Sequence, residues 1–349
     1  MTLQEAVDRY DGAVDFLMKE KEIDGRSKKT LSSYSDTFRQ FRSFFIDLHR
    51  DDEEVNDPGF LDMQKFRDSL FERGNKISSV NLKMTHMGIL FDAMSDESLG
   101  ECRVYDRNPV TSRVKPSIRK EYKKEYDQIL TDEQVVKLWK NEPPKNYRGW
   151  TWPRDYAMIM LFLTTEIRNS ELADLRVSDL DYEYGEITVR RGKGDKKRCV
   201  EFPEIAQYAV KLYLESGARP AELSDDDYLF GTTYEKRKGA GINTAFGKEE
   251  WHKLSRQFIS WAVEKRVKKI TGVSSVMSHD LRHVGARLDL NNGMEPIELQ
   301  SKLGHSHFLT TEIYCGKLGT KRGRASAERV FRERDIQAER NMEKLRAAP

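Results

Sequence analysis

Six residues in the last two-thirds of the sequence belong to types that could together cleave a phosphodiester bond. They are Arg168, Lys193, His279, Arg282, His305 and Tyr314. Arginine can direct two parallel N–H donors at phosphate oxygens, which lysine cannot do, while lysine and histidine can transfer protons. A tyrosine hydroxyl can act as a nucleophile in covalent catalysis. The set therefore predicts a reaction in which fixed cations stabilise the charge that develops on the phosphate.

The two arginines lie close to expected helix starts. Arg168 lies in a loop that enters a helix, and Glu171 follows three residues later. Ser278 is expected to be the N-cap of a second helix, which places His279 in the first turn and Arg282 on the same helix. Free N–H groups and the helix dipole attract phosphate to such ends. Both motifs are therefore suited to binding an anion.

Lys193 and His305 are expected at turns, and Tyr314 on a helix that follows. Two glycines bracket Lys193 at the tip of a predicted β-hairpin. Gly304 is expected to end a helix and leave the His305 imidazole free to donate a hydrogen bond. Tyr314 follows nine residues after His305, on the next predicted helix.

Taken singly, these motifs have simpler explanations. Arg168 could pair only with Glu171 on its own helix, Lys193 could be an ordinary turn residue, and Tyr314 could be a core aromatic. The order and spacing of the whole set argue against that interpretation.

A zinc site is a further alternative, because His279 and His283 are four residues apart. However, Asp280 follows His279 where the motif His-Glu-x-x-His has its catalytic glutamate, and no third ligand is apparent. We therefore predict neither a metal site nor a cofactor.

Together the motifs resemble the catalytic signature of the tyrosine recombinases, the phage-integrase family. The resemblance implies that Arg168 and Arg282 bind the phosphate, and that His305 donates a hydrogen bond to it. It further implies a nucleophilic Tyr314 and a Lys193 that protonates the leaving 5′ oxygen. His279 would act as a proton acceptor or orienting group. Glu171 and His283 would have supporting roles.

Two features depart from the family pattern. The family usually has glycine where Glu166 stands, and a glutamate two residues before Arg168 is expected to pull on its guanidinium or force a different turn. The segment 218–249 also looks longer than the matching loop of the smallest relatives.

The N-terminal third is expected to be helical. Apolar residues recur at steps of three and four in two stretches, which indicates amphipathic helices, the first of them capped by Ser27 or Thr30. The two stripes are Leu31, Tyr34, Phe38, Phe41, Phe45 and Leu48, and Val80, Met84, Met87, Phe91 and Met94. Methionine fills gaps between helices, so core packing is favoured over a soft-metal site. Shorter helices are expected at about 3–21 and 60–73.

The predicted fold is mainly α, with a small β-hairpin in an α+β catalytic domain. We expect a helical core-binding domain over 1–112, a basic linker over 113–127, a catalytic domain over 128–324 and a C-terminal helix over 325–349. The last helix either packs on its own domain or, as the resemblance implies, docks into a neighbouring protomer. The linker is expected to follow a nucleic-acid backbone through Arg113, Lys115, Arg119, Lys120, Lys123 and Lys124.

Charge and composition fit this interpretation. Residues 1–113 carry 17 basic and 22 acidic side chains, whereas the remainder has a net charge of +7. The longest apolar stretch, 157–163, is too short to span a bilayer, and the three scattered cysteines suggest free thiols in a reducing compartment. With no signal segment evident, a cytoplasmic, nucleoid-associated protein is expected.

The resemblance predicts a site-specific DNA recombinase that acts through a 3′-phosphotyrosine intermediate and a Holliday junction. Its expected partners are double-stranded DNA with paired inverted-repeat sites and three further copies of the chain, in a tetramer. Relaxation of supercoils by a type IB topoisomerase and DNA binding without cleavage are the alternatives.

Overall fold

The computed structural model describes residues 1–116, 129–143, 151–190, 197–220, 222–233, 251–305, 311 and 321–346. The chain divides into two compact units, Met1–Lys123 and Lys124–Pro349. This division falls inside the segment predicted as the linker. The folded part of the first unit nevertheless extends beyond the predicted boundary, because Val114 is fully buried in its core.

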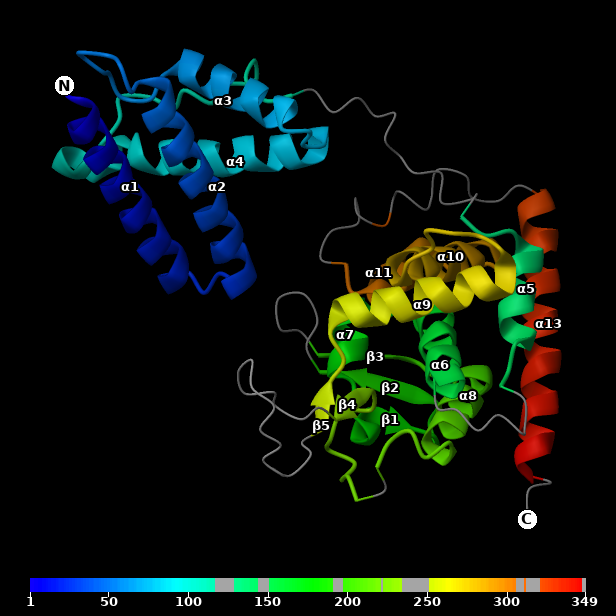
Figure 1. The fold of residues 1–349 in the computed structure, drawn as a ribbon. Coiled ribbons are helices and arrows are strands. Elements are labelled where there is room, and N and C mark those ends of the chain that lie inside the picture. Colours follow the sequence, from blue (N-terminus) through cyan, green and yellow to red (C-terminus); the bar gives the residue numbers. More distant parts are fainter. Residues whose placement is uncertain are drawn as a thin grey trace. The chain divides into compact units, whose positions relative to one another are not determined.

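The first unit is helical, as its periodicity predicts (Figure 1). Its elements are α1 (Leu3–Ile23), α2 (Lys28–Leu48), α3 (Phe60–Glu72), α4 (Ile77–Met94) and a 3₁₀ turn, η1 (Glu97–Cys102). Ser27 is the N-cap of α2, and its side chain accepts a hydrogen bond from the N–H of Thr30. One alternative for the start of this helix is thereby confirmed.

The core of the first unit is almost entirely apolar. The buried face of α2 presents Tyr34, Phe38, Phe41 and Phe45, while Leu31 and Leu48 are half-buried. On α4 the complete predicted stripe is buried, including its three methionines. The methionines pack among aromatic rings, which confirms their expected role in the core.

The second unit surrounds a buried central helix with further helices and two small sheets. Its helical elements are α5 (Asp132–Lys140), α6 (Thr151–Thr164), α7 (Asn169–Asp174), the 3₁₀ turn η4 (Val177–Asp179), α8 (Glu204–Glu215), α9 (Arg256–Thr271), α10 (Ser278–Asn291), α11 (Pro296–Leu303) and α13 (Lys321–Arg346). The central helix α6 is buried from Pro153 to Thr164 and packs against α8, α9 and α10. A continuous apolar run is what a helix enclosed on all sides requires.

A three-stranded antiparallel sheet lies in the order β1 (Leu180–Asp181), β2 (Glu186–Val189) and β3 (Arg198–Glu201). The pairing of Val189 with Arg198 confirms the predicted hairpin. A second sheet pairs β4 (Gly231–Thr233), which lies within the segment 218–249, with β5 (Trp251–Lys253), and neither strand was predicted. Three-residue strands are too short to produce a readable alternation.

The helix α13 packs on α5, α8 and α10 of its own unit (Figure 1). It begins at Lys321 rather than near Ala325, and it buries Val330 and Asn341. The Gln337 side chain donates to Asn341 Oδ1 at 2.8 Å within this contact. No helix in the described ranges is long and apolar enough to cross a membrane.

Candidate active site

Arg168 occupies the N-cap of α7, where the chain turns out of α6. Glu171 accepts from the Arg168 N–H at 2.7 Å and from its Nη1 at 2.9 Å. The simple pairing of these two residues is therefore present, but it is not the only contact. Arg168 Nη2 also donates to the carbonyl of Gly304 at 2.9 Å, across 136 residues of sequence.

Arg198, which we did not predict as a site residue, joins this group from the first position of β3. Its two terminal nitrogens donate to the two oxygens of Glu171, each at 2.8 Å, and its Nε donates to the Lys302 carbonyl at 3.1 Å. The sequence held a signal for it, because Arg198 falls on the same strand face as the buried Val200. An arginine on an inward-facing strand position requires a partner.

The carboxylate of Glu171 accepts hydrogen bonds from both Arg168 and Arg198, an arrangement that suits its predicted supporting role. Burial by itself raises the pKa of Glu171. Hydrogen bonds and positive charge from Arg198 and Arg168 outweigh that effect, so the pKa lies below its usual value. Glu171 is therefore ionised at neutral pH and fixes the two guanidinium groups relative to each other.

Arg282 lies on α10 and is only 1% exposed. Its Nη1 donates to the carbonyl of Glu166, and its Nη2 donates to the carbonyl of Leu303 at 2.8 Å. Carbonyl oxygens hold the guanidinium without cancelling its charge. The side chain thus brings a buried positive charge to the site.

Three consecutive carbonyl groups at the end of α11 accept hydrogen bonds from three arginine side chains. Arg198, Arg282 and Arg168 donate in turn to residues 302, 303 and 304. Gly304 ends the helix in the left-handed conformation, with φ +62°, as predicted. A Cβ at this position would lie 3.1 Å from the Arg198 guanidinium, so glycine also allows that side chain to approach.

His305 follows at once and is half-buried. Its Nε2 lies 3.4 Å from Arg282 Nη2, and its Nδ1 lies 3.0 Å from the hydroxyl of Thr311. Burial, followed by the charges of Arg282, Arg168 and Arg198, lowers the pKa of His305 to about 4. The ring is therefore neutral at pH 7 and bonded on both sides, not free as predicted.

His279 and His283 lie one turn apart on α10, with ring centroids 4.4 Å apart and planes at 76°. His279 is exposed and His283 is buried. The nearby His279 contributes electrostatically to the lowered pKa of His305. Within the described ranges, no group of three or more metal-ligating side chains is found.

The expected N-cap of α10 is wrong by one residue. Met277 is the N-cap, and its N–H donates to Asp280 Oδ2 at 3.0 Å. The hydroxyl of Ser278 instead accepts from the Asn169 side chain at 3.0 Å. That contact joins the start of α10 to the start of α7, while His279 stays in the first turn.

The carboxylate of Glu166 contacts Lys302 and not Arg168, so the first of the two expected effects is not seen. Glu166 adopts φ +48°, and its side chain turns inward to accept from Lys302 Nζ at 3.0 Å. A positive φ is a conformation that glycine adopts without strain, and the Arg168 guanidinium contacts Glu171 and Gly304.

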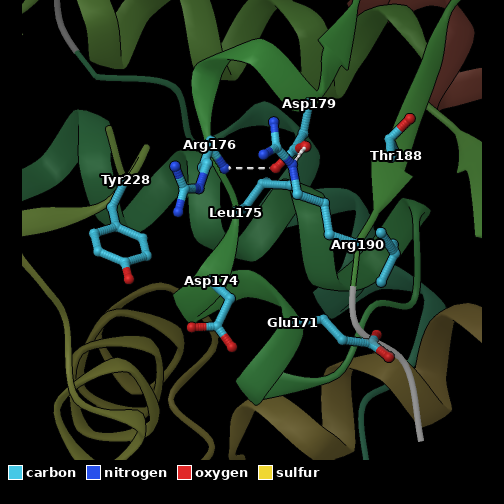
Figure 2. A pocket seen from close by; sticks show the side chains of 9 residues that line it. Glu171, Asp174, Leu175, Arg176, Asp179, Thr188, Arg190 and Tyr228 are labelled. Carbon is cyan, nitrogen blue, oxygen red and sulfur yellow. Dashed lines mark hydrogen bonds and ion pairs between the residues drawn. The ribbon is translucent and has the colours of Figure 1, made fainter. Parts of the chain in front are cut away.

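Lys193 and Tyr314 lie outside the described residues, so their contacts are not part of this geometry. The base of the Lys193 hairpin is described, and a cleft of about 270 Å³ lies beside it (Figure 2). Asp179 pairs there with Arg190 and accepts from the N–H of Arg176 at 2.9 Å. Asp179 and Arg190 thus neutralise each other, and their ion pair stabilises the end of β2. We therefore do not interpret this cleft as a ligand site.

Of the basic residues expected to contact DNA, the described ones are Arg113 and Lys115. Both belong to the folded part of the first unit, and the Arg113 carbonyl accepts from Arg67 at 3.4 Å. The other four, at positions 119, 120, 123 and 124, lie outside the described residues.

Comparisons with known proteins identify the family of this chain. Residues 128–319 match the model of the phage integrase family. Tyrosine recombinase XerA of Pyrococcus furiosus is 30% identical over 293 residues, which cover 84% of this chain and 85% of that protein. Tyrosine recombinase XerC of Staphylococcus epidermidis is 28% identical, with 82% of this chain and 86% of that protein covered.

Solved structures show the same fold. A XerH recombinase in a post-cleavage complex with its palindromic difH substrate matches with a TM-score of 0.61 and 19% identity, over 82% of this chain and 75% of that one. The Tn1549 transposon integrase with circular intermediate DNA gives 0.62 and 18%, over 93% and 99%. The chain therefore belongs to the phage integrase family and is a site-specific tyrosine recombinase that acts on DNA.

Proposed function

We propose that this recombinase breaks and rejoins DNA through a covalent 3′-phosphotyrosine bond at Tyr314. The convergence of Arg168, Arg198 and Arg282 on the end of α11 is the observation that carries the proposal. One carboxylate, Glu171, faces two of these arginines, and neutral carbonyls hold the third. The site therefore has an excess of positive charge, which suits a phosphate whose charge grows in the transition state.

The scissile phosphate would lie between His305 and the two predicted arginines. His305 Nε2 and Arg282 Nη2 are 3.4 Å apart, so one phosphate oxygen can contact both at ordinary hydrogen-bond lengths. In that state Nε2 must carry the imidazole proton, and the Thr311 hydroxyl must donate to Nδ1. Arg168 is the more accessible arginine, since its side chain is 23% exposed, and it would bind a second oxygen.

The reaction then needs a nucleophile and an acid. Tyr314 Oη attacks phosphorus, the bond from phosphorus to the 5′ oxygen breaks, and Lys193 gives that oxygen its proton. His279 would accept the phenol proton, with His283 packed against its ring. Attack by a 5′ hydroxyl of the partner strand reverses these steps and rejoins the DNA.

Two observations support these placements. Thr311 contacts His305. Three residues of chain span at most about 11 Å, so chain connectivity keeps the Cα atom of Tyr314 within that distance of the Cα atom of Thr311. The hairpin pairs Val189 with Arg198, which anchors the far end of the Lys193 loop at the same arginine that binds Glu171.

We further propose a homotetramer on paired inverted-repeat sites, with exchange through a Holliday junction. The basic segment 113–124 would follow the backbone of the duplex. Exchange of α13 between protomers remains part of this proposal, as an alternative to the packing of α13 on its own unit. The biological outcome would be integration or excision of a mobile element, or resolution of DNA.

The test is a suicide duplex with a nick near the cleavage point, which traps the covalent complex. The wild-type chain should be trapped, and Tyr314→Phe should not be. Tyr182→Phe is the matched control, because it removes a buried hydroxyl of the same domain that has no hydrogen-bond partner among the described residues, and it should leave trapping intact. Trapping by Tyr314→Phe would overturn the assignment. Failure of the wild-type chain to be trapped would favour a DNA-binding protein that does not cleave.

A further inference from the structure

Glu166 combines two features that are costly for a folded chain. Its side chain is fully buried, and its φ of +48° lies in the left-handed region that disfavours side chains. The only other non-glycine residue with positive φ among the described residues is Ser275, which is exposed. Such strain costs about 1–3 kcal/mol and persists only where the surroundings fix the conformation.

The surroundings of Glu166 are parts of the active site. Its carbonyl accepts from Arg282, and its Oε1 accepts from Lys302 Nζ at 3.0 Å. The Lys302 ammonium also pairs with Asp289 on α10. One residue thus contacts a site arginine through its main chain and, through its side chain, the lysine that directly precedes Leu303.

A glycine makes room for this arrangement. A Cβ at Gly285 would lie 3.1 Å from both Cγ and Oε1 of Glu166, and 2.4 Å from the Leu163 carbonyl. Because a 2.4 Å approach to a backbone oxygen is not tolerated, any side chain at 285 would push α10 away from the end of α6. The close contact of α6 and α10 and the buried glutamate therefore depend on the same glycine.

The group adds little net charge to the site. Burial and the neighbouring Asp289 raise the pKa of Glu166, which favours its protonated form. Burial lowers the pKa of Lys302, but the two carboxyl groups outweigh it and raise that pKa, so the ammonium is charged. A protonated Glu166 would leave the charge of Lys302 to its ion pair with Asp289.

We propose that Glu166 is a positioning residue of the recombinase site, which sets the end of α11 through Lys302 and orients Arg282 through its own carbonyl. The Lys302 carbonyl and the two that follow hold Arg198, Arg282 and Arg168. A displacement of Lys302 therefore moves three arginines and His305 together. Displacements of about 1 Å cost on the order of 10²-fold in rate when they misplace reacting groups. The inference rests on the phosphate-binding roles proposed above.

The experiment measures single-turnover cleavage of the suicide duplex at saturating DNA, and DNA affinity separately. Glu166→Gly restores a residue that adopts positive φ without strain, yet it removes the Lys302 contact. Its cleavage rate should fall at least tenfold, with the dissociation constant for DNA within twofold of wild type. Glu166→Gln keeps the oxygen that Lys302 contacts, and it should cleave within threefold of wild type.

Lys302→Met removes the same contact by changing its other partner. It keeps the proposal testable if Glu166→Gly is unfolded at the assay temperature. It should lose at least tenfold in cleavage rate. The double variant should be no slower than the slower single variant, because Lys302→Met already removes the Glu166 contact, together with the pair that Lys302 forms with Asp289. Ser275→Gly is the matched control, since it relieves a similar backbone strain at an exposed position and should cleave like wild type.

Three results would overturn the proposal: cleavage by Glu166→Gly and Lys302→Met within twofold of wild type, losses that appear wholly as weaker DNA binding, or losses that multiply in the double variant. Failure of wild-type cleavage would instead contradict the proposed function, so the two failures are distinguishable.

Discussion

The two units of the chain bury different kinds of residue. In the described part of the first unit, the buried polar side chains are Thr37 and His86, which contact each other at 2.9 Å. The second unit buries many more, and several of them adjoin the end of α11, among them Glu166, Glu171 and Arg282. The first unit is held together by apolar area, whereas the second also contains charges whose positions matter for chemistry.

This contrast shows where substitutions should affect stability alone and where they should affect the reaction. Buried charges need paired partners, and removal of one partner leaves the other uncompensated. Apolar cores respond to lost volume and leave distant groups in place.

The largest effect is expected at Arg282. Arg282→Ala removes the buried charge and leaves the Leu303 and Glu166 carbonyls without their donor. Loss of one such stabilising donor costs on the order of 10²–10³-fold in rate, so the cleavage rate at saturating DNA should fall by at least about 10²-fold. Single-turnover cleavage of the suicide duplex measures it.

The matched substitution in the first unit is Phe41→Ala. It should lower the free energy of unfolding by about 3–5 kcal/mol, as other buried Phe truncations do. Well below its melting temperature, cleavage per folded molecule should stay within twofold of wild type once DNA is saturating. A large loss of cleavage for Phe41→Ala, or none for Arg282→Ala, would remove the distinction between the units.

A smaller effect concerns the titration of His305. Its pKa of about 4 should appear as a titration midpoint far below 6.5 when the imidazole is followed by NMR in the free protein. Because the charge of Arg168 helps to lower this pKa, Arg168→Ala should raise it. A wild-type midpoint at 6 or above would contradict the positive environment of the site.

The same shift has a consequence for stability. The pKa of His305 is lower in the folded chain than in an unfolded one, so the unfolded chain binds the proton more tightly. The contribution of His305 to stability is therefore complete above about pH 6.5 and is lost as the pH falls toward 4. Replacement by glutamine should reduce this part of the acid sensitivity.

The smallest effect is expected at the polar pair of the first unit. Thr37→Val keeps the shape of the side chain but leaves His86 Nδ1 without its hydroxyl partner, which costs about 1–3 kcal/mol for a buried group. Denaturant unfolding of the full chain measures it, and Thr37→Ser should retain most of the stability. DNA cleavage below the melting temperature should be unchanged in both variants.

The contrast between the units also explains which features could be predicted from the sequence. Helical periodicity predicted α2 and α4 and most of the residues on their buried faces, because their stability comes from one apolar face. The alternation around residues 185–202 predicted the β2–β3 hairpin. Local sequence patterns were sufficient to predict the elements whose formation depends on residues close together in the sequence.

Contacts between distant segments could not be read in this way. Arg198 meets Lys302 across 104 residues, and Glu166 meets the same lysine across 136. Neither pairing leaves a periodic signal, so the role of Arg198 was missed and the contact of Glu166 with Lys302 was not predicted. The recurring order of motifs in the family supplied the remaining predicted site residues.

The inward turn of Glu166 has a consequence for the history of the sequence. A Cβ at Gly285 would lie 2.4 Å from the Leu163 carbonyl and 3.1 Å from the Glu166 side chain, so the contact of α6 and α10 requires this glycine whichever residue stands at 166. A glycine at 166 would adopt the positive φ without strain and would leave Gly285 suited to its place. The glutamate could therefore have been gained by substitution at 166 alone once Gly285 was present, and close homologues with either residue at 166 should carry glycine at 285.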